Sequence, residues 1–409
     1  MKPDTRFDLL IIGAGPAGSF AAELLAKSGA KVALFDGRPE GEPKACGGGV
    51  TAKALKAWPQ LLNAVGRTVT ELDLYSPSSK RLHLALDEPF AIYSRIAFDC
   101  YLRDRAREAG AHVISGKISA RKTKRAGDGW RVIGDAGTEW NGSFLIGADG
   151  ANSGIAKMLA GPLPPSDMEV AFGYRAPLPA NNVAATAVAF LPGWVGYAWA
   201  FPRPDHISFG IATTQDAFNH EPLDDLLWQF MIGYYEQCEG PRNRRQVKFW
   251  QNGVDTPERS RIQEHLRATA ERYAARIPGL AAKTWDSRKV CGDDWALLGD
   301  AAGFADPVTG EGIYYALRSA ELFVEAYANG AALSYEKRWR EDFGAELRRA
   351  AQMRPRFYGN FLGAPFTERM IEFARGHRGV KRVLGDLVAG EQGYVDLKKK
   401  LVKSALRPV

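Results

Sequence analysis

Three glycines near the N-terminus have the type and spacing of a phosphate-binding turn. Gly13-Ala14-Gly15-Pro16-Ala17-Gly18 fits the pattern G-x-G-x-x-G, between a predicted strand at Phe7–Ile12 and a predicted helix at Pro16–Ser28. The first glycine permits the tight turn, the second lets the backbone approach a pyrophosphate, and the third allows close packing of the helix. Asp36 closes the next predicted strand, Lys31–Phe35, where an acid accepts hydrogen bonds from a ribose. These residues predict a dinucleotide site.

Two further motifs place an aspartate directly after a predicted strand. Gly147-Ala148-Asp149-Gly150-Ala151-Asn152-Ser153 follows the strand Phe144–Ala148, and Gly299-Asp300-Ala301-Ala302 overlaps the end of Trp295–Gly299. Each aspartate has an alternative interpretation as a turn or helix-capping residue. The three motifs in this order resemble the fingerprints of the flavoprotein hydroxylase superfamily. That resemblance implies FAD, with Asp300 held to the ribityl chain and Asp149 close to the diphosphate. We expect the FAD to be non-covalent, because no histidine or cysteine lies in an evident attachment motif.

The resemblance extends to other candidate contacts of the cofactor. Pro307–Ile313 opens a helix, and a helix N-terminus directed at the flavin would stabilise the negative charge of its reduced form; the alternative is an ordinary glycine-rich helix entry. Arg95 matches a recurrent arginine near FAD in the superfamily, or else is a solvated residue at a helix start. The full set of predicted cofactor contacts is Gly13, Gly15, Ala17, Gly18, Asp36, Arg38, Cys46, Gly47, Gly48, Arg95, Asp149, Gly299, Asp300, Gly310, Gly312 and Ile313.

Two more segments resemble the signatures of the geranylgeranyl reductases, flavoenzymes that saturate isoprenoid double bonds. They are Lys44-Ala45-Cys46-Gly47-Gly48-Gly49 and Tyr197-Ala198-Trp199-Ala200-Phe201-Pro202. The resemblance implies that the cysteine-glycine loop passes beside the flavin and that Cys46 is the catalytic proton donor or relay. It also implies that Tyr197, Trp199 and Phe201, which alternate onto one face of a strand, bind the substrate. The alternatives are an inert buried cysteine and an aromatic strand that serves only packing.

The implied activity is reduction of an isoprenoid, geranylgeranyl-type substrate by hydride transfer from reduced flavin in a dry pocket. No second G-x-G-x-x-G opens a βαβ unit, so the reductant is expected to be transiently bound NAD(P)H or a protein electron donor. A flavin-dependent monooxygenase or halogenase acting on a small aromatic or natural-product substrate is the alternative enzyme. A flavin-binding carrier is the non-enzymatic alternative.

Composition sets limits on these interpretations. The 409 residues are 45% hydrophobic and 25% charged, which excludes a disordered or collagen-like chain. No apolar run is long enough for a spanning helix, and we expect a cytoplasmic protein. The four cysteines and six histidines are scattered, so the sequence predicts neither a disulfide framework nor a metal site.

The elements that position these residues form a mixed pattern. A βαβ start predicts a doubly wound, Rossmann-like FAD-binding domain over 1–64, 91–165 and 284–340, with a helix at Ile92–Ala109. Strands on both sides of a turn at Pro202–His206 predict an antiparallel-sheet substrate domain over 65–90 and 166–283. That domain includes helices at Leu223–Gln237 and Arg259–Arg276. Residues 341–409 are expected to form a helical C-terminal region.

The excess positive charge lies at the C-terminal end. Residues 361–409 hold 10 Lys and Arg against 5 Asp and Glu, which is +5 of the net +7. Lys398-Lys399-Lys400 lies between Leu397 and Leu401-Val402, as in a helix that binds a membrane surface. This predicts peripheral contact with anionic membranes; the alternative is a solvated helix.

Overall fold

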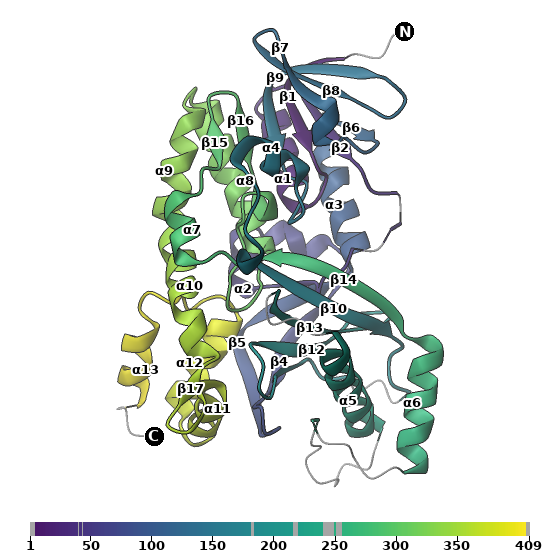
Figure 1. Ribbon diagram of the computed structural model, residues 1–409, viewed down its shortest axis with the longest axis vertical. Helices are drawn as coiled ribbons and strands as arrows, with labels where there is room; N and C mark the ends of the chain where they lie inside the picture. The colour runs from purple at the N-terminus through teal and green to yellow at the C-terminus, as the bar shows by residue number, and fades with distance from the viewer. Residues whose placement is uncertain are drawn as a thin grey trace. The chain divides into compact units, whose positions relative to one another are not determined.

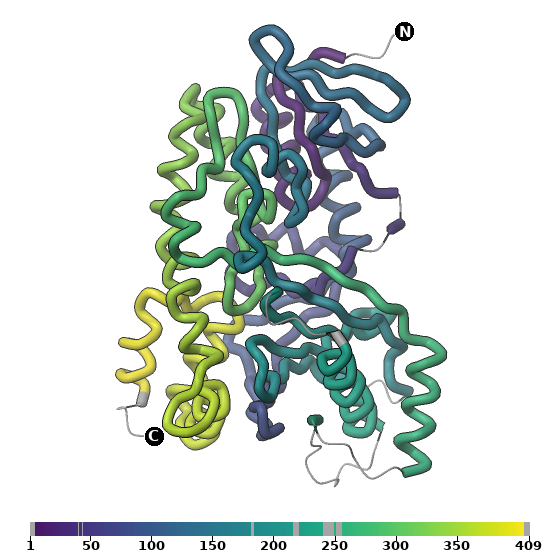
Figure 2. The backbone as a smooth tube through the Cα atoms, viewed as in Figure 1, coloured from purple at the N-terminus to yellow at the C-terminus, as the bar shows by residue number. Residues whose placement is uncertain are grey.

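The computed structural model describes residues 5–39, 41–42, 44–180, 184–215, 220–239, 249–250 and 256–405, which form two compact units (Figure 1). Unit 1 comprises Met1–Lys44, Arg95–Met168 and Ile277–Ala351. Unit 2 comprises Ala45–Ser94, Glu169–Arg276 and Gln352–Val409. Each unit is therefore assembled from three separate stretches of chain, whose order the colours of Figure 2 trace.

Unit 1 is built on a largely parallel sheet. Its strands are β1 (Arg6–Ile12), β2 (Val32–Asp36), β6 (His112–Ser115), β7 (Thr123–Ala126), β8 (Gly129–Ile133), β9 (Glu139–Gly147), β15 (Cys291–Gly292) and β16 (Trp295–Leu297). The order is β15-β16-β9-β1-β2-β6, and the four pairings from β16 to β6 are all parallel. The helices are α1 (Pro16–Lys27), α3 (Arg95–Glu108), α4 (Gly154–Ala160), α7 (Ala282–Ser287), α8 (Ile313–Ala328) and α9 (Tyr335–Trp339). This confirms the expected Rossmann-like domain.

The central strands of unit 1 are continuous apolar runs because helices cover the sheet. Leu9, Leu10 and Ile11 of β1 have no exposed surface, and Val32–Phe35 of β2 is equally buried. Strands buried on both faces lack the polar alternation of a half-exposed strand. α1, which follows β1, packs against both α3 and α8.

Unit 2 is built on a mostly antiparallel sheet of order β14-β10-β13-β12-β11-β4-β5-β3. The strands are β3 (Gly49–Val50), β4 (Gly66–Tyr75), β5 (Arg81–Tyr93), β10 (Met168–Ala176), β11 (Ala187–Phe190), β12 (Gly196–Pro202), β13 (Ile207–Thr214) and β14 (Glu271–Pro278). The helices are α2 (Ala52–Ala57), α5 (His220–Glu239) and α6 (Pro257–Thr269). Ala198, Ala200 and Phe209 on one face of the sheet share a buried core with Leu227 and Phe230 of α5.

Helices cover much of the C-terminal part, as expected. α10 (Ala345–Phe357) runs across the boundary between the ranges of the two units. A small hairpin of β17 (Asn360–Phe361) and β18 (Ala364–Pro365) follows, and then α11 (Phe366–Gly376), α12 (Arg378–Val388) and α13 (Leu397–Ala405). α11 and α12 pack on β5 of unit 2, and α13 packs on α12 (Figure 1).

Two predicted helices were wrong at one end. The helix predicted from Ile92 begins at Arg95, because Ile92 and Tyr93 end the long strand β5. The helix predicted as Arg259–Arg276 ends at Thr269, and Glu271–Pro278 forms the edge strand β14 beside β10. Pairing at the sheet edge outweighs the helical propensity of the alanines and arginines there.

The two units also divide the chain differently from the sequence-based boundaries. Residues 45–64 group with unit 2, where β3 pairs with β5. Residues 352–409 group with unit 2 as well, whereas residues 341–351 group with unit 1. None of the helices in the described part of the chain is long and apolar enough to cross a membrane.

Candidate functional site

The turn after β1 has the geometry of a pyrophosphate cradle. Gly13 adopts φ +108°, and a Cβ atom on it would lie 2.3 Å from the Ala148 carbonyl oxygen. A Cβ on Gly18 would lie 1.9 Å from the Gly13 carbonyl oxygen. The backbone of α1 therefore packs directly against the backbone of the turn. At Gly15, by contrast, no atom lies within 4 Å of the position of a Cβ. α1 also starts without a side-chain cap or an acidic residue in its first turn, so its positive end is open to an anion.

The third motif meets the start of α8. Gly299 adopts φ +55°, and a Cβ there would lie 3.1 Å from Ala17 and 3.2 Å from Ala316. Asp300 is half-buried, and its Oδ1 lies 3.0 Å from the position of a Cβ on Gly312. Within the described residues, no group donates a hydrogen bond to the Asp300 carboxylate. A glycine at 312 therefore leaves room for a carboxylate that is available to a ligand hydroxyl.

Asp306, which the sequence analysis missed, shapes the loop before α8. Its Oδ1 accepts hydrogen bonds from the amides of Val308 (2.7 Å) and Thr309 (3.2 Å). Its backbone N–H donates a hydrogen bond to the Glu311 carbonyl oxygen, and its carbonyl oxygen accepts one from the Gly310 amide. These two bonds close the loop. Gly310 adopts φ +70°, and Gly312 precedes Ile313 as an uncapped start of α8. The signal in the sequence was the aspartate directly before Pro307.

The predicted arginines of unit 1 belong to one charged cluster. Arg38 donates its backbone N–H to Asp36 Oδ1 (3.2 Å), and Arg103 pairs with Asp36 Oδ2 at 2.9 Å. Arg95 is buried and forms a two-point contact with Asp99 (2.9 and 3.0 Å), which Arg38 also reaches at 2.6 Å. Burial alone would raise the pKa of Asp99, but Arg95, Lys44 and Arg38 hold it below its usual value. Arg95 is thus not the solvated helix-start residue of the alternative interpretation.

Asp149 makes the contacts of a helix-capping residue. Its carboxylate accepts hydrogen bonds from Ser153 and from the amides of Gly154 (2.9 Å) and Ile155 (3.3 Å) at the start of α4. Burial raises its pKa despite these donors. The second motif also borders the first, because a Cβ on Gly13 would lie 2.8 Å from the Asp149 Cα. A direct contact between Asp149 and a diphosphate stays a prediction.

In unit 2 the cysteine-glycine loop is held in a defined conformation. The Gly48 amide donates to the Cys46 sulfur at 3.3 Å, and Gly48 adopts φ +80°. A Cβ on Gly48 would lie 2.2 Å from the Tyr93 carbonyl oxygen, and one on Gly47 would lie 3.2 Å from the Phe201 ring. Glycine is therefore required at 48, and the loop lies against the aromatic strand.

Arg203, which the sequence analysis also missed, binds the backbone of this loop. Its buried guanidinium donates through Nη2 to the carbonyl oxygens of Cys46 (2.7 Å) and Gly47 (3.0 Å). Ser208 Oγ lies 3.5 Å from the Cys46 oxygen and 2.8 Å from the Tyr273 hydroxyl. Burial raises the pKa of Tyr273 to about 12, so the phenol stays protonated at neutral pH. Arg203 directly follows the aromatic signature, whereas Tyr273 lies in the segment that was predicted as a helix.

The predicted substrate residues form one aromatic row. The ring centroids of Tyr197 and Trp199 are 6.0 Å apart, and those of Trp199 and Phe201 are 6.4 Å apart. Ala198 and Ala200 face the core on the other side, so the alternation was predicted correctly. A Cβ on Gly210 would lie 2.2 Å from the Trp199 ring, which therefore lies flat over β13. The buried Trp199 N–H has no hydrogen-bond partner among the described residues.

The structure therefore places the predicted residues in two sets. Unit 1 holds the glycine turn, Asp36, Arg38, Arg95, Asp149 and the segment from Gly299 to Ile313, and these fit a dinucleotide with a flavin. Unit 2 holds Cys46, Gly47 and Gly48 together with Tyr197, Trp199 and Phe201.

Comparisons with known proteins agree with this chemistry. The family model described as an FAD binding domain matches residues 6–324. A chloroplastic geranylgeranyl diphosphate reductase of Oryza sativa subsp. japonica is 30% identical over 351 residues, which cover 80% of this chain and 67% of the relative. A digeranylgeranylglycerophospholipid reductase of Methanocaldococcus jannaschii is 27% identical over 361 residues, 82% of each chain.

Solved structures show the same fold. A geranylgeranyl bacteriochlorophyll reductase-like protein of Thermoplasma acidophilum superposes with a TM-score of 0.71 at 22% identity, over 98% of this chain and 99% of that one. The flavin-dependent brominase Bmp2 superposes with a TM-score of 0.64 at 19% identity, over 98% and 99%. At these identities the likeness concerns the fold alone.

Proposed function

Because the chain belongs to the geranylgeranyl reductase family of FAD-dependent oxidoreductases, we propose that it saturates carbon–carbon double bonds of an isoprenoid substrate. The observation that carries this proposal is the packing of the Cys46–Gly48 loop against the aromatic row of Tyr197, Trp199 and Phe201. A row of apolar rings offers an extended surface to a polyprenyl chain. Bound FAD, once reduced, would supply the hydride for such a reaction.

The residues of unit 1 are suited to hold the cofactor. The open backbone at Gly15 and the positive end of α1 would hold the pyrophosphate, and Asp36 would hold the ribose. The carboxylate of Asp300, which accepts no hydrogen bond from the described residues, would accept from ribityl hydroxyls. The uncapped start of α8 at Ile313 would stabilise negative charge on a reduced flavin.

The residues of unit 2 would supply the proton and the dry surface. Cys46 is the proposed proton donor or relay, and its sulfur is oriented by the Gly48 amide. The buried N–H of Trp199 is a donor that remains available to a polar atom of a bound molecule. Arg203 fixes the loop through two carbonyls and is a positioning residue.

The electron donor and the membrane contact are finer proposals. We infer that transiently bound NAD(P)H or a protein donor reduces the flavin, because the sequence has one dinucleotide fingerprint only. We also infer that Lys398, Lys399 and Lys400, all exposed on α13, attract the protein to anionic lipid. Leu397 is buried, whereas Leu401 is half-buried and Val402 of the same helix is exposed.

Anaerobic turnover tests the proposed reaction. Dithionite-reduced protein is incubated with geranylgeranyl diphosphate in detergent, and mass spectrometry measures the product. We expect gains of two hydrogens per double bond, with reoxidation of the flavin. No mass gain, together with substrate-dependent oxygen uptake in the presence of NAD(P)H, would instead identify a monooxygenase or halogenase.

A further inference from the structure

We propose that the β17–β18 hairpin is an apolar anchor that inserts into the surface of an anionic lipid membrane. The hairpin ends in Phe361 and Leu362, whose side chains are 51% and 76% exposed. Leu362 is the most exposed large hydrophobic residue in the described part of the chain. The Phe361 ring makes an edge contact with Phe366 (6.1 Å between centroids), but about half of the residue remains in water. Such exposed apolar surface gains from leaving water at a lipid surface.

The backbone of the tip holds these side chains outward. Leu362 adopts φ +50°, a left-handed conformation that is unfavourable for a residue with a side chain. Arg369 on α11 donates from Nη2 to the Leu362 carbonyl oxygen at 3.1 Å, which fixes the turn. The fold therefore maintains an exposed leucine where glycine would be less strained.

A third exposed apolar side chain continues the surface. Phe373 lies one turn after Arg369 on α11 and is 46% exposed. Its ring packs against His377 in a tilted arrangement with centroids 4.0 Å apart. We call Phe361, Leu362, Arg369 and Phe373 the hairpin patch; β17 and α11 lie side by side (Figure 1).

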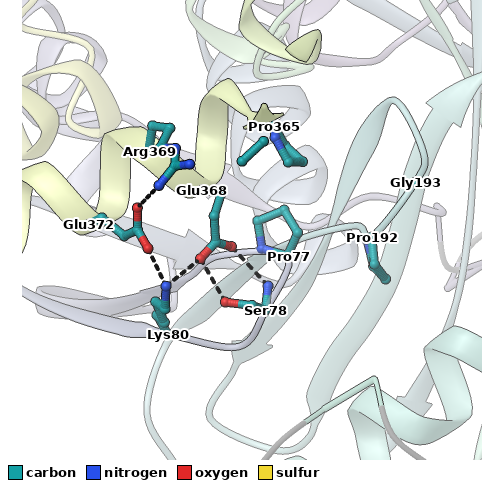
Figure 3. A pocket seen from close by; sticks show the side chains of 10 residues that line it. Pro77, Ser78, Lys80, Pro192, Gly193, Pro365, Glu368, Arg369 and Glu372 are labelled. Carbon is teal, nitrogen blue, oxygen red and sulfur yellow. Dashed lines mark hydrogen bonds and ion pairs between the residues drawn. The ribbon is translucent and has the colours of Figure 1, made fainter. Parts of the chain in front are cut away.

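Ion pairs and a hydrogen bond connect the helix behind the hairpin patch, α11, to the β4–β5 turn. A shallow pocket of about 460 Å³ separates the start of α11 from the β4–β5 turn, and ion pairs cross it (Figure 3). Lys80 pairs with Glu372 and, at 3.1 Å, with Glu368, which also accepts from Ser78 Oγ at 2.6 Å. α11 is thereby tied to the sheet, so insertion of the tip would orient unit 2 at the membrane.

Charge favours anionic lipid as the partner. Residues 354–378 contain five arginines and two glutamates. Both glutamates are engaged in ion pairs with Lys80 or Arg369. Arg356, Arg375 and Arg378 are exposed in the same stretch of chain, which therefore carries an excess of positive charge. Exposed apolar side chains in a stretch of chain with excess exposed arginine match the acyl chains and anionic headgroups of such a surface.

This inference rests on the proposed membrane contact but predicts a different physical signature. Attraction by α13 requires charge and vanishes in high salt, whereas insertion of the hairpin removes apolar surface from water and persists there. Neither outcome affects reduction of a detergent-solubilised substrate, so failure of the anchor and failure of the proposed reductase are separable.

Two tryptophan probes in the whole flavoprotein test the anchor. Leu362→Trp reports on the tip, and Leu333→Trp, at a site that is 55% exposed in unit 1, is the matched control. Each variant is mixed with saturating phosphatidylglycerol vesicles, with and without brominated acyl chains. We expect bromine quenching and a shift to shorter emission wavelength for Leu362→Trp relative to wild type, with neither change for Leu333→Trp.

A loss-of-function variant provides a second measurement. Phe361→Ser/Leu362→Ser should lower vesicle affinity in high salt on the order of tenfold or more, since two large apolar side chains no longer leave water. Wild-type affinity in this variant would overturn the anchor, as would equal quenching of both probes or an absence of vesicle binding. A concentration-dependent blue shift of Leu362→Trp without vesicles would also overturn it and would assign the tip to a second copy of the chain.

Discussion

At the scale of single residues, the proposed chemistry depends on how one thiol is held. Cys46 is only half-buried, and its loop consists mainly of glycine, which has no side chain with which to anchor itself. Arg203 supplies the missing anchor from the neighbouring strand end. A buried cation that donates to two carbonyls fixes the backbone while leaving the sulfur unobstructed.

Replacement of Cys46 tests its role as proton donor. Cys46→Ala and Cys46→Ser should retain FAD and its rate of reduction, but slow substrate-dependent flavin reoxidation by about 10²-fold, as for the loss of a positioned acid. Stopped-flow absorbance of the flavin measures both rates. Cys238→Ala, at another half-buried thiol of unit 2, is the control. Wild-type reoxidation in Cys46→Ala would leave the residue with a packing role.

Replacement of Arg203 tests whether the loop needs its anchor. Arg203→Met leaves two carbonyls without their donor, which should cost about 1–3 kcal/mol of stability and slow reoxidation of the flavin. A positioning role also predicts that Arg203→Met changes the rate at which iodoacetamide alkylates Cys46. Arg203→Lys should then restore that alkylation rate as well as the melting temperature, whereas a purely structural role requires only the restored melting temperature. Unchanged alkylation in Arg203→Met would contradict the positioning role.

The residues that sequence reasoning identified differ in kind from those it missed. Gly13 and Gly18 are required by close backbone contacts, and Gly299 is required by its left-handed backbone with φ +55°. A local motif encodes each of these positions. Arg203, which directly follows β12, reaches the Cys46 loop across more than 150 residues of sequence. Tyr273 of β14 contacts Ser208 of β13 because both strands lie in one sheet, and neither contact leaves a local pattern. Long-range contacts of this kind cannot be inferred from one sequence.

At the scale of elements, the β1–α1 turn separates two functions of glycine. Gly18 is needed for packing, since a Cβ there would overlap the Gly13 oxygen, whereas Gly15 has open space and an extended backbone with φ −79°. Gly18→Ala should therefore lower the melting temperature of the apoprotein. Gly15→Ala should leave it unchanged and yet weaken FAD binding, because the methyl group occupies the proposed pyrophosphate position. Fluorescence titration with FAD measures the second effect; equal FAD affinity in Gly15→Ala and wild type would disprove it.

The elements themselves were predictable where the local pattern was strong. The βαβ start and the β12–β13 hairpin follow from apolar runs and turn residues, and both formed as predicted. β14 did not, because Glu271–Pro278 is rich in alanine and arginine and its strand state comes from the edge of β10. The helix predicted at that position reflects the local propensity of these residues correctly. It was wrong because pairing with β10, which the local sequence does not encode, decides the structure.

At the scale of the whole molecule, each unit is complete only when its three separate stretches of chain pack together. Unit 1 takes its first motif from residues before Lys44 and its third from residues after Ile277. A cofactor that contacts all three motifs would thus link the beginning and the end of that unit. The boundaries could not be read from composition, since no linker of distinctive sequence separates the stretches.

The basic C-terminal helix α13 leads to a prediction about the affinity of the protein for anionic vesicles. Each lysine near an anionic surface contributes about 1 kcal/mol, so Lys398→Gln/Lys399→Gln/Lys400→Gln should weaken binding to anionic vesicles by about 10²-fold at low salt. Co-sedimentation with vesicles measures it. A variant with the same loss of net charge, Lys124→Gln/Lys283→Gln/Lys289→Gln in unit 1, should bind like wild type. If both triple variants lost affinity equally, net charge rather than α13 would govern attraction. If neutral vesicles retained the wild-type protein as well as anionic ones at low salt, electrostatic docking would be refuted.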